Sequence, residues 1–221
     1  MDDLIADFHI HSKYSHDSLM SPESIVKRAK NVGLTCIAIT DHGTIRGGVE
    51  GKKIARNYGV EVISGAEIKT DRGDIIGLYL NEEIKVTDLQ EVIRAIRSQG
   101  GIVVLPHPYR DHYHLEEIAQ CVDFIECWNS RCNPDENTNA ELLAGSSEKK
   151  IMYGSDAHCL SEIGLVKVQL QLNPYTIEKV ISCLYTHPLT IRTSQIISHV
   201  KKHEYRQLMH QGARFLWEKI T

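Results

Sequence analysis

The chain has 221 residues, a formal net charge of −4, 42% hydrophobic and 24% charged residues, and 12 histidines. This composition predicts one globular domain over residues 1–221, and the mild charge gives no indication of a nucleic-acid-binding protein. We expect no membrane association and no signal peptide, because no apolar run approaches roughly 20 residues and the chain starts with acidic residues. The six cysteines form no Cys-x-x-Cys pair, which indicates reduced thiols and a cytoplasmic protein.

Predicted strands and helices alternate along the chain. A first strand over 4–11 leads to a helix that begins at the N-cap Ser21 and ends at Gly33. Further strands are predicted over 35–40, 60–64, 74–80, 102–105, 124–129, 150–153 and 166–172. Further helices are predicted over 45–58, 87–98, 115–121, 139–146, 174–184 and 193–219. This alternation is typical of a parallel α/β fold in one domain.

Residues that can bind metals stand at the ends of five predicted strands. His9 and His11 are two residues apart on the first strand, and side chains at that spacing point to the same face. The other strand ends carry Asp41 and His42, Glu67, His107, and Asp156 and His158. Because ligands in parallel α/β folds bind at the carboxyl ends of the strands, we expect these side chains to meet at one rim.

Imidazole and carboxylate ligands together suit zinc, manganese or iron. The candidates outnumber the four ligands of a closed structural zinc site, so we expect two or three divalent ions, with Glu67 and Asp156 as bridging carboxylates. Such a centre makes hydroxide from water near neutral pH and stabilises the oxygens of a phosphoryl transfer. The sequence has no Gly-x-x-x-x-Gly-Lys loop, so phosphate binding would fall to metals and arginines. The predicted reaction is metal-assisted hydrolysis of a phosphoester.

The strand-end motifs resemble those of the PHP (polymerase and histidinol phosphatase) family, in the order that the family has them. They are residues 7–12 (DFHIHS) with 14–18 (YSHDS), 39–43 (ITDHG), 65–68 (GAEI), 106–108 (PHP) and 154–158 (GSDAH). The resemblance covers roughly residues 3–172. It implies a distorted (β/α)7 TIM-like barrel over about 3–185, followed by the C-terminal helical segment, and phosphoesterase activity at a trinuclear centre of manganese, zinc or iron.

The resemblance also implies which residues would hold each ion. His9, His11, Glu67 and Asp156 would hold the first, and Glu67 would bridge to a second ion bound by His107. Asp17, His42 and His158 would hold the third. Asp41 would lie behind these ligands and orient one of them. Asp17 is preferred to its neighbour His16, which we expect in solvent.

Two positions depart from the family pattern. After the strand that ends at His107, many members supply a histidine or cysteine, whereas this chain has Glu126 and Cys127 at 126–127. Either residue could complete the second metal site, or the position could be open to water. Related phosphatases often place a histidine in the fourth strand, where this chain has Asp74. The role of Asp74 is therefore left open.

Three residues are predicted to act in catalysis. They are Asp156, His158 and Arg131, whose guanidinium group matches the geometry of phosphate oxygens. A surface salt bridge is the alternative role for Arg131. Arg110 and His112 follow the loop of His107 and could also face the substrate. In the C-terminal segment, an apolar stripe that includes Ile196, Ile197, Val200 and Leu208 is expected to dock the helix on the barrel.

Three functions agree with these patterns. The first is a phosphoesterase that acts on a small phosphomonoester or a nucleotide, with histidinol phosphate phosphatase as a special case. The second is a nuclease that acts on nucleic-acid ends, which the acidic charge disfavours. The third is a metal-binding module with degenerate catalysis, which the nearly complete ligand set disfavours. We favour the first, with a small phosphorylated substrate, and leave the oligomeric state open.

Overall fold

The computed structural model describes residues 4–172 and 175–202. One nine-stranded sheet has the order β7-β6-β5-β4-β3-β2-β1-β8-β9. Its strands are β1 (Leu4–Ile10), β2 (Cys36–His42), β3 (Glu61–Thr70), β4 (Gly73–Leu78), β5 (Ile102–Leu105), β6 (Phe124–Asn129), β7 (Lys150–Gly154), β8 (Val166–Leu172) and β9 (Tyr175–Cys183). The helices are α1 (Pro22–Asn31), α2 (Arg46–Ala55), α3 (Leu89–Ser98), α4 (Leu115–Cys121), α5 (Pro134–Ser146) and α6 (Pro188–Lys201).

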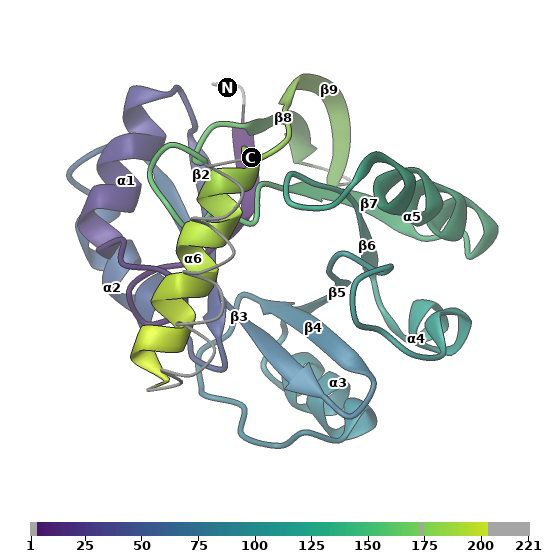
Figure 1. Ribbon diagram of the computed structural model, residues 1–221. Helices are drawn as coiled ribbons and strands as arrows, with labels where there is room; N and C mark the ends of the chain where they lie inside the picture. Colours follow the sequence, from purple (N-terminus) through teal and green to yellow (C-terminus); the bar gives the residue numbers. More distant parts are fainter. Residues whose placement is uncertain (1–3, 173–174, 203–221) are drawn as a thin grey trace, which may run out of the picture.

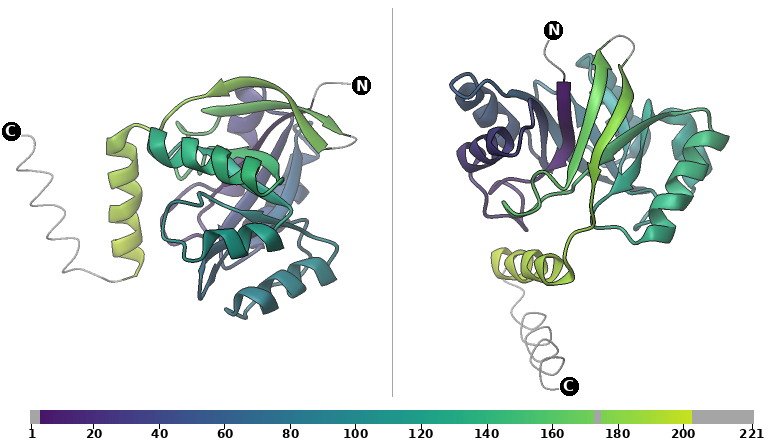
Figure 2. Two further views of the ribbon diagram at one scale, coloured as in Figure 1. Left: turned by 90° about the vertical axis from the view of Figure 1, so that its right-hand side faces the viewer. Right: turned by 90° about the horizontal axis from the view of Figure 1, so that it is seen from above.

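The sheet curls into a nearly closed barrel, which confirms the predicted fold. Strands β1 to β7 lie in the sheet in chain order, and α1 to α5 surround them (Figure 1). The two ends of this series approach each other where Ile10, the last residue of β1, forms a parallel bridge with Ala157, which follows β7. The first half of β1 pairs with β8. The β8–β9 hairpin extends the sheet beyond β1 (Figure 2). None of the helices in the described part of the chain combines the length and the hydrophobicity of a membrane-spanning segment.

Strand β4 departs from the parallel arrangement expected from the sequence. It follows β3 after the two-residue turn at 71–72 and pairs with it in antiparallel fashion, with Thr70 opposite Gly73. β5 is also antiparallel to β4. A connection of two residues can join only antiparallel strands, because a parallel pair needs a crossover of about a dozen residues. Gly73 has a φ of 123°, which a side chain would disfavour at this turn.

The predicted helix over 174–184 is wrong. Residues Tyr175–Cys183 form β9, which pairs with β8 along its whole length. Four of its nine residues are β-branched, and such side chains favour a pleated strand over a helix. The neighbouring β8 offers an open edge, so pairing with it satisfies the backbone of the segment.

Two helices begin earlier than predicted. Helix α5 starts at Pro134 rather than 139, because Asn133 and Glu136 form a capping box. Helix α6 starts at Pro188 rather than 193, with His187 as its N-cap. The predicted continuation of this last helix over 203–219, including Leu208, lies outside the described residues.

The barrel interior is apolar toward the start of the strands and polar toward their ends. One buried cluster contains inward-facing residues of the strands, among them Ala6, Phe8, Ala38, Ile63, Val104 and Met152. Two further clusters fill the space between the sheet and its helices, one under α1 and α2 and the other under α3 to α5. The apolar core therefore supports a polar rim at the carboxyl ends of the strands.

Gly47 allows α2 to lie directly against the end of β2. A Cβ at this position would overlap the Asp41 carboxylate and lie 2.5 Å from Ser12 Oγ and 2.9 Å from Ile39 Cγ2. We expect Gly47→Ala to lower the free energy of unfolding by about 1–3 kcal/mol through overpacking. Gly145 in α5 is the matched control: nothing lies within 4 Å of its Cβ position, so Gly145→Ala should raise that energy by about 0.5–1 kcal/mol. Urea denaturation measures both, and equal effects would contradict this packing.

Candidate metal centre

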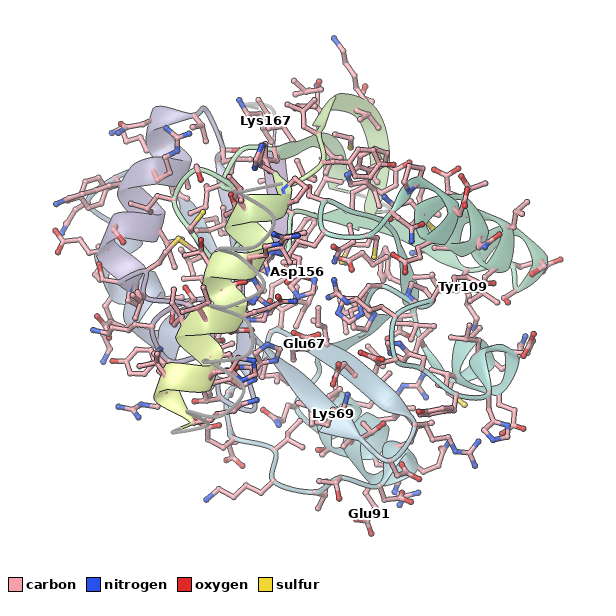
Figure 3. The ribbon with its side chains drawn as sticks, viewed as in Figure 1. Glu67, Lys69, Glu91, Tyr109, Asp156 and Lys167 are labelled. Atoms are coloured by element: carbon pink, nitrogen blue, oxygen red, sulfur yellow. The ribbon has the colours of Figure 1, made fainter. Side chains whose placement is uncertain are left out.

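The eight side chains predicted as metal ligands meet at one end of the barrel, where Glu67 and Asp156 lie beside α6 (Figure 3). Together with Asp74, they fall into groups whose possible ligand atoms all lie within 4.8 Å of one another. These groups are His11, Asp17, His42 and His158; His9, His11 and Glu67; His9, His107 and Asp156; and Glu67, Asp74 and His107. Several residues belong to two groups, as expected of adjacent metal sites that share ligands.

His9, on β1, and His11, directly after it, lie side by side, with 3.0 Å between His9 Nε2 and His11 Nε2. The register of β1 on β2 shifts between Asp7 and Ile10, an irregularity of the kind that re-aims side chains. The Asp7 carboxylate accepts the backbone N–H groups of His9 and Ser155, which ties β1 to the segment after β7. Burial raises the pKa of Asp7 to about 7.

Glu67, on β3, lies at the centre of the cluster. Its carboxylate oxygens are 2.9 Å from His107 Nε2, 3.2 Å from His42 Nδ1, 3.3 Å from His11 Nε2 and 3.4 Å from His9 Nε2. Burial opposes ionisation of this carboxyl, but the surrounding imidazoles hold its pKa well below the usual range. Glu67 is therefore an anionic group that can be shared between sites.

Asp156 reaches the cluster from the loop after β7. One carboxylate oxygen lies 3.3 Å from His11 Nε2 and 3.5 Å from His9 Nε2, and the other accepts a 2.7 Å hydrogen bond from Arg110 Nη2. Asp156 and His107 have left-handed backbones, with φ of 54° and 28°. Non-glycine residues in this region are uncommon and concentrate at functional sites.

Asp17 brings the loop after β1 into the cluster. Its Oδ2 lies 2.9 Å from His158 Nε2 and 3.3 Å from His42 Nε2. Its Oδ1 is buried and has no hydrogen-bond partner among the described residues. The neighbouring His16 instead stacks on His42 at the rim, with ring centroids 4.5 Å apart, and remains 37% exposed.

Three histidines have their Nδ1 atoms anchored and present Nε2 to the cluster. His9 Nδ1 lies 2.9 Å from Glu126 Oε1, His11 Nδ1 3.0 Å from Ser15 Oγ, and His158 Nδ1 2.7 Å from the carbonyl oxygen of Asp156. An acceptor at Nδ1 fixes the tautomer in which Nε2 carries the lone pair, as in metal-binding histidines.

Asp41 lies outside the cluster and supports it through hydrogen bonds to the loop after β1. Its carboxylate accepts hydrogen bonds from the hydroxyl groups of Ser12 (2.7 Å) and Ser15 (2.9 Å). Since Ser15 in turn lies 3.0 Å from His11 Nδ1, a series of hydrogen bonds leads from Asp41 to a predicted ligand. Ser15 itself was not singled out from the sequence, because a serine in a polar loop carries no distinctive signal.

Glu126 and Cys127 point to opposite faces of β6. Glu126 is 2% exposed, and its second oxygen accepts the N–H of His107 (2.8 Å) and of the Asn129 side chain (2.9 Å). Burial raises its pKa, but the charges of His9 and His107 bring the pKa below the ordinary value. Cys127 packs in the core against α5, with Sγ 3.6 Å from the carbonyl oxygen of Ala140. Cys127 therefore lies away from the metal-ligand cluster.

The two arginines of the site differ in their contacts. Arg131 is 8% exposed and bonds Glu162 (3.0 Å) and Ser194 (3.0 Å). Glu162, which the sequence analysis missed, also accepts the N–H groups of His158 and Cys159. Arg131 thus forms a buried ion pair rather than a surface one, and its side chain lines the same cavity as Arg110. His112 bonds two backbone carbonyl groups, those of Arg110 and Asp74.

A family model described as the PHP domain matches residues 7–182. The chain belongs to the PHP domain family. Together with the cluster of possible metal ligands, this membership makes the chain a metal-dependent hydrolase that acts on phosphoester bonds.

Individual relatives extend the comparison. An uncharacterized protein of Methanocaldococcus jannaschii is 50% identical over 115 residues, which are 47% of this chain and 67% of the relative. A 5'-3' exoribonuclease of Haemophilus influenzae is 36% identical over 103 residues, covering 44% of this chain and 37% of the relative. A crystal structure from Bifidobacterium adolescentis, assigned to the metal-dependent phosphoesterases, has a TM-score of 0.60 at 16% identity and covers 87% of this chain and 96% of that chain. At that identity it supports the fold alone.

The donor set fits the metal ions that a PHP domain implies. Two buried atoms that could bind a metal ion, Asp17 Oδ1 and His107 Nδ1, have no hydrogen-bond partner among the described residues. The anchored imidazoles and anionic carboxylates are the forms that bind zinc, manganese or iron. Asp74, whose role the sequence left open, stands with Glu67 and His107 in one group.

Proposed function

We propose that this PHP domain hydrolyses a small phosphomonoester or a nucleotide at a centre of two or three divalent ions. The proposal rests on one observation: ligand side chains from the ends of several strands form overlapping groups at a single cavity. Manganese, zinc and iron are the proposed ions, because the donors are imidazoles and carboxylates. The six cysteines are all free, which agrees with the proposed cytoplasmic location.

We propose one set of ligands for each ion. His9, His11, Glu67 and Asp156 would hold the first ion. Glu67 would be shared with a second, completed by His107 and, in this chain, by Asp74. The third would lie among Asp17, His42 and His158. When bound, the ions would supply Lewis acidity and lower the pKa of a coordinated water.

The chain's own cations would receive the phosphate group. Arg110 lines the cavity and uses one amino group on Asp156, which leaves further N–H donors for a phosphate oxygen. Arg131 is the second proposed contact, held in place by its pair with Glu162. Because Glu162 also bonds the backbone of His158, we propose that Arg131 also positions this ligand. Asp156 and His158 would act in catalysis as ligands beside the reacting phosphorus.

A nuclease acting on nucleic-acid ends is the second candidate. The observation that favours it is the partial match to the 5'-3' exoribonuclease of Haemophilus influenzae. The same metal-ligand cluster could cleave a phosphodiester. The net charge of −4 gives this alternative no support.

A phosphatase screen of the full chain, reconstituted separately with manganese, zinc and iron, tests the proposal. The panel contains p-nitrophenyl phosphate, bis-p-nitrophenyl phosphate, nucleoside monophosphates, histidinol phosphate and short oligonucleotides. We expect phosphate release from the monoesters, abolished in His107→Ala. Turnover of diesters or oligonucleotides alone would favour the nuclease, and no turnover with any metal would favour a degenerate metal-binding module.

A further inference from the structure

Helix α6 covers the mouth of the cavity that contains the metal-ligand cluster. Five residues of α6 line this cavity together with Glu67 and Asp156: Ile191, Ser194, Gln195, Ser198 and His199. The helix crosses the open end of the barrel, with Glu67 and Asp156 beside it in this view (Figure 3). The PHP family model matches the chain only as far as residue 182, and α6 begins at Pro188. The cover therefore comes from a segment outside the matched domain.

Lys201 fastens the last turn of α6 to the loop after β1. Its Nζ donates to the carbonyl oxygens of Lys13 (3.0 Å), Ser15 (2.7 Å) and Ser18 (2.6 Å). An ammonium group has three N–H donors, so these contacts use all of them. The same loop carries Asp17, so the helix is joined directly to a segment that forms the cluster.

A second set of contacts holds the middle of α6. Ser194 Oγ accepts a 3.0 Å hydrogen bond from Arg131 Nη1, in the loop after β6. Ser198 Oγ lies 3.2 Å from His16 Nδ1, in the loop after β1. Since the two loops follow different strands, α6 is attached on two sides of the cavity, and its position over the cluster is defined by side-chain contacts.

The covered cavity is small and polar. Its volume is about 360 Å³, which is close to the lower end of the 300–1,000 Å³ typical of small-molecule sites. Among the described residues that line it there is no phenylalanine, tyrosine or tryptophan. Sites for single-stranded nucleic acid combine a basic groove with aromatic rings that stack on successive bases. The rings that line this cavity are the imidazoles of His42, His158 and His199, and its volume holds one small molecule.

We propose that α6 restricts the site to phosphomonoesters of single-nucleotide size or smaller, with the leaving group held between the metal-ligand cluster and Gln195 and Ser198. This inference rests on the proposed phosphoesterase function and names its substrate class. Helix α6 would thus exclude longer nucleic acids, and its polar residues would contact the part of the substrate that leaves.

Three monoesters of increasing size test the inference on the metal-reconstituted full chain: glycerol phosphate, adenosine 5'-monophosphate and a 5'-phosphorylated trinucleotide. For the unmodified protein we expect kcat/KM for the monophosphate to exceed that for the trinucleotide by at least about 100-fold. Gln195→Trp narrows the cavity and should raise KM for adenosine 5'-monophosphate about tenfold, with little effect on glycerol phosphate. Thr193→Trp, an exposed position on the same helix that does not line the cavity, is the matched control.

Binding provides a readout that is independent of turnover. Calorimetry with the non-hydrolysable 5'-methylenephosphonate analogue of adenosine monophosphate should show weaker binding to Gln195→Trp than to Thr193→Trp. Equal kcat/KM for the monophosphate and the trinucleotide, or equal effects of the two tryptophan variants, would overturn the inference. If the unmodified protein releases phosphate from none of the three substrates, the proposed function fails, and the calorimetric comparison still decides whether α6 borders a nucleotide-sized site.

Discussion

Glu67→Gln is expected to lower kcat for phosphomonoester hydrolysis by at least about 10³-fold, since several kcal/mol of metal-derived stabilisation would be lost. The substitution keeps the size of the side chain but removes the charge that lies within 3.4 Å of four imidazoles. An amide oxygen is a poorer ligand than a carboxylate, and the amide nitrogen cannot bind a cation. Steady-state phosphate release measures the effect.

The matched control for this substitution is Glu61→Gln. Glu61 is the first residue of the same strand, β3, and its side chain is exposed at the opposite end of the barrel. The control protein should retain its activity and its metal content. If both variants lose activity equally, or if Glu67→Gln retains it, Glu67 is not the shared ligand that we propose.

Glu126→Gln is expected to weaken metal binding or activity by about 10–100-fold, the usual cost of removing a group that orients a metal ligand. The carboxylate accepts from His9 Nδ1 with one oxygen and from the His107 backbone with the other, so it positions two proposed ligands. In the glutamine variant only the amide oxygen can accept a hydrogen bond, so one of these two contacts would be lost. Metal titration followed by activity measurement separates the loss of affinity from the loss of turnover.

Cys127→Ala is the control for Glu126→Gln, because the two residues are adjacent on β6 and face opposite ways. Cys127 is fully buried in the core, so its truncation should cost about 1–2 kcal/mol of unfolding free energy and leave kcat unchanged. A drop in kcat for Cys127→Ala comparable with that of Glu126→Gln would contradict the assignment of these two faces.

The sequence predicted the elements whose signals are local. The capped helix after Ser21 and the strand before Asp41 lie where the pattern placed them, and the ligand residues at the strand ends meet because the strands that carry them lie side by side in one barrel. The segment 175–183 was misjudged because its nine residues fit a helical stripe almost as well as a strand. Its pairing with β8 decided the structure, and that contact is not visible in the segment itself.

Within the candidate site, the residues that contact and orient the proposed ligands were harder to predict from the sequence than the proposed ligands themselves. Ser15 and Glu162 act on His11 and His158 through contacts that only the folded loops create. The sequence analysis named Glu126 as a candidate but did not predict that it orients His9. That role depends on the 2.9 Å contact between Glu126 Oε1 and His9 Nδ1, which are 117 residues apart in the chain. The position of α6 over the cavity depends in the same way on Lys201 and a loop near the start of the chain.

Metal content is the most direct test of the central claim that these strand ends form a multinuclear centre. The full chain is reconstituted separately with manganese, zinc and iron, desalted, and analysed by inductively coupled plasma mass spectrometry. We expect about two to three ions per chain with at least one of these metals, and a lower content in Glu67→Gln, because that residue is proposed to be shared. Fewer than about one ion per chain with every metal, or an unchanged content in Glu67→Gln, would contradict the account.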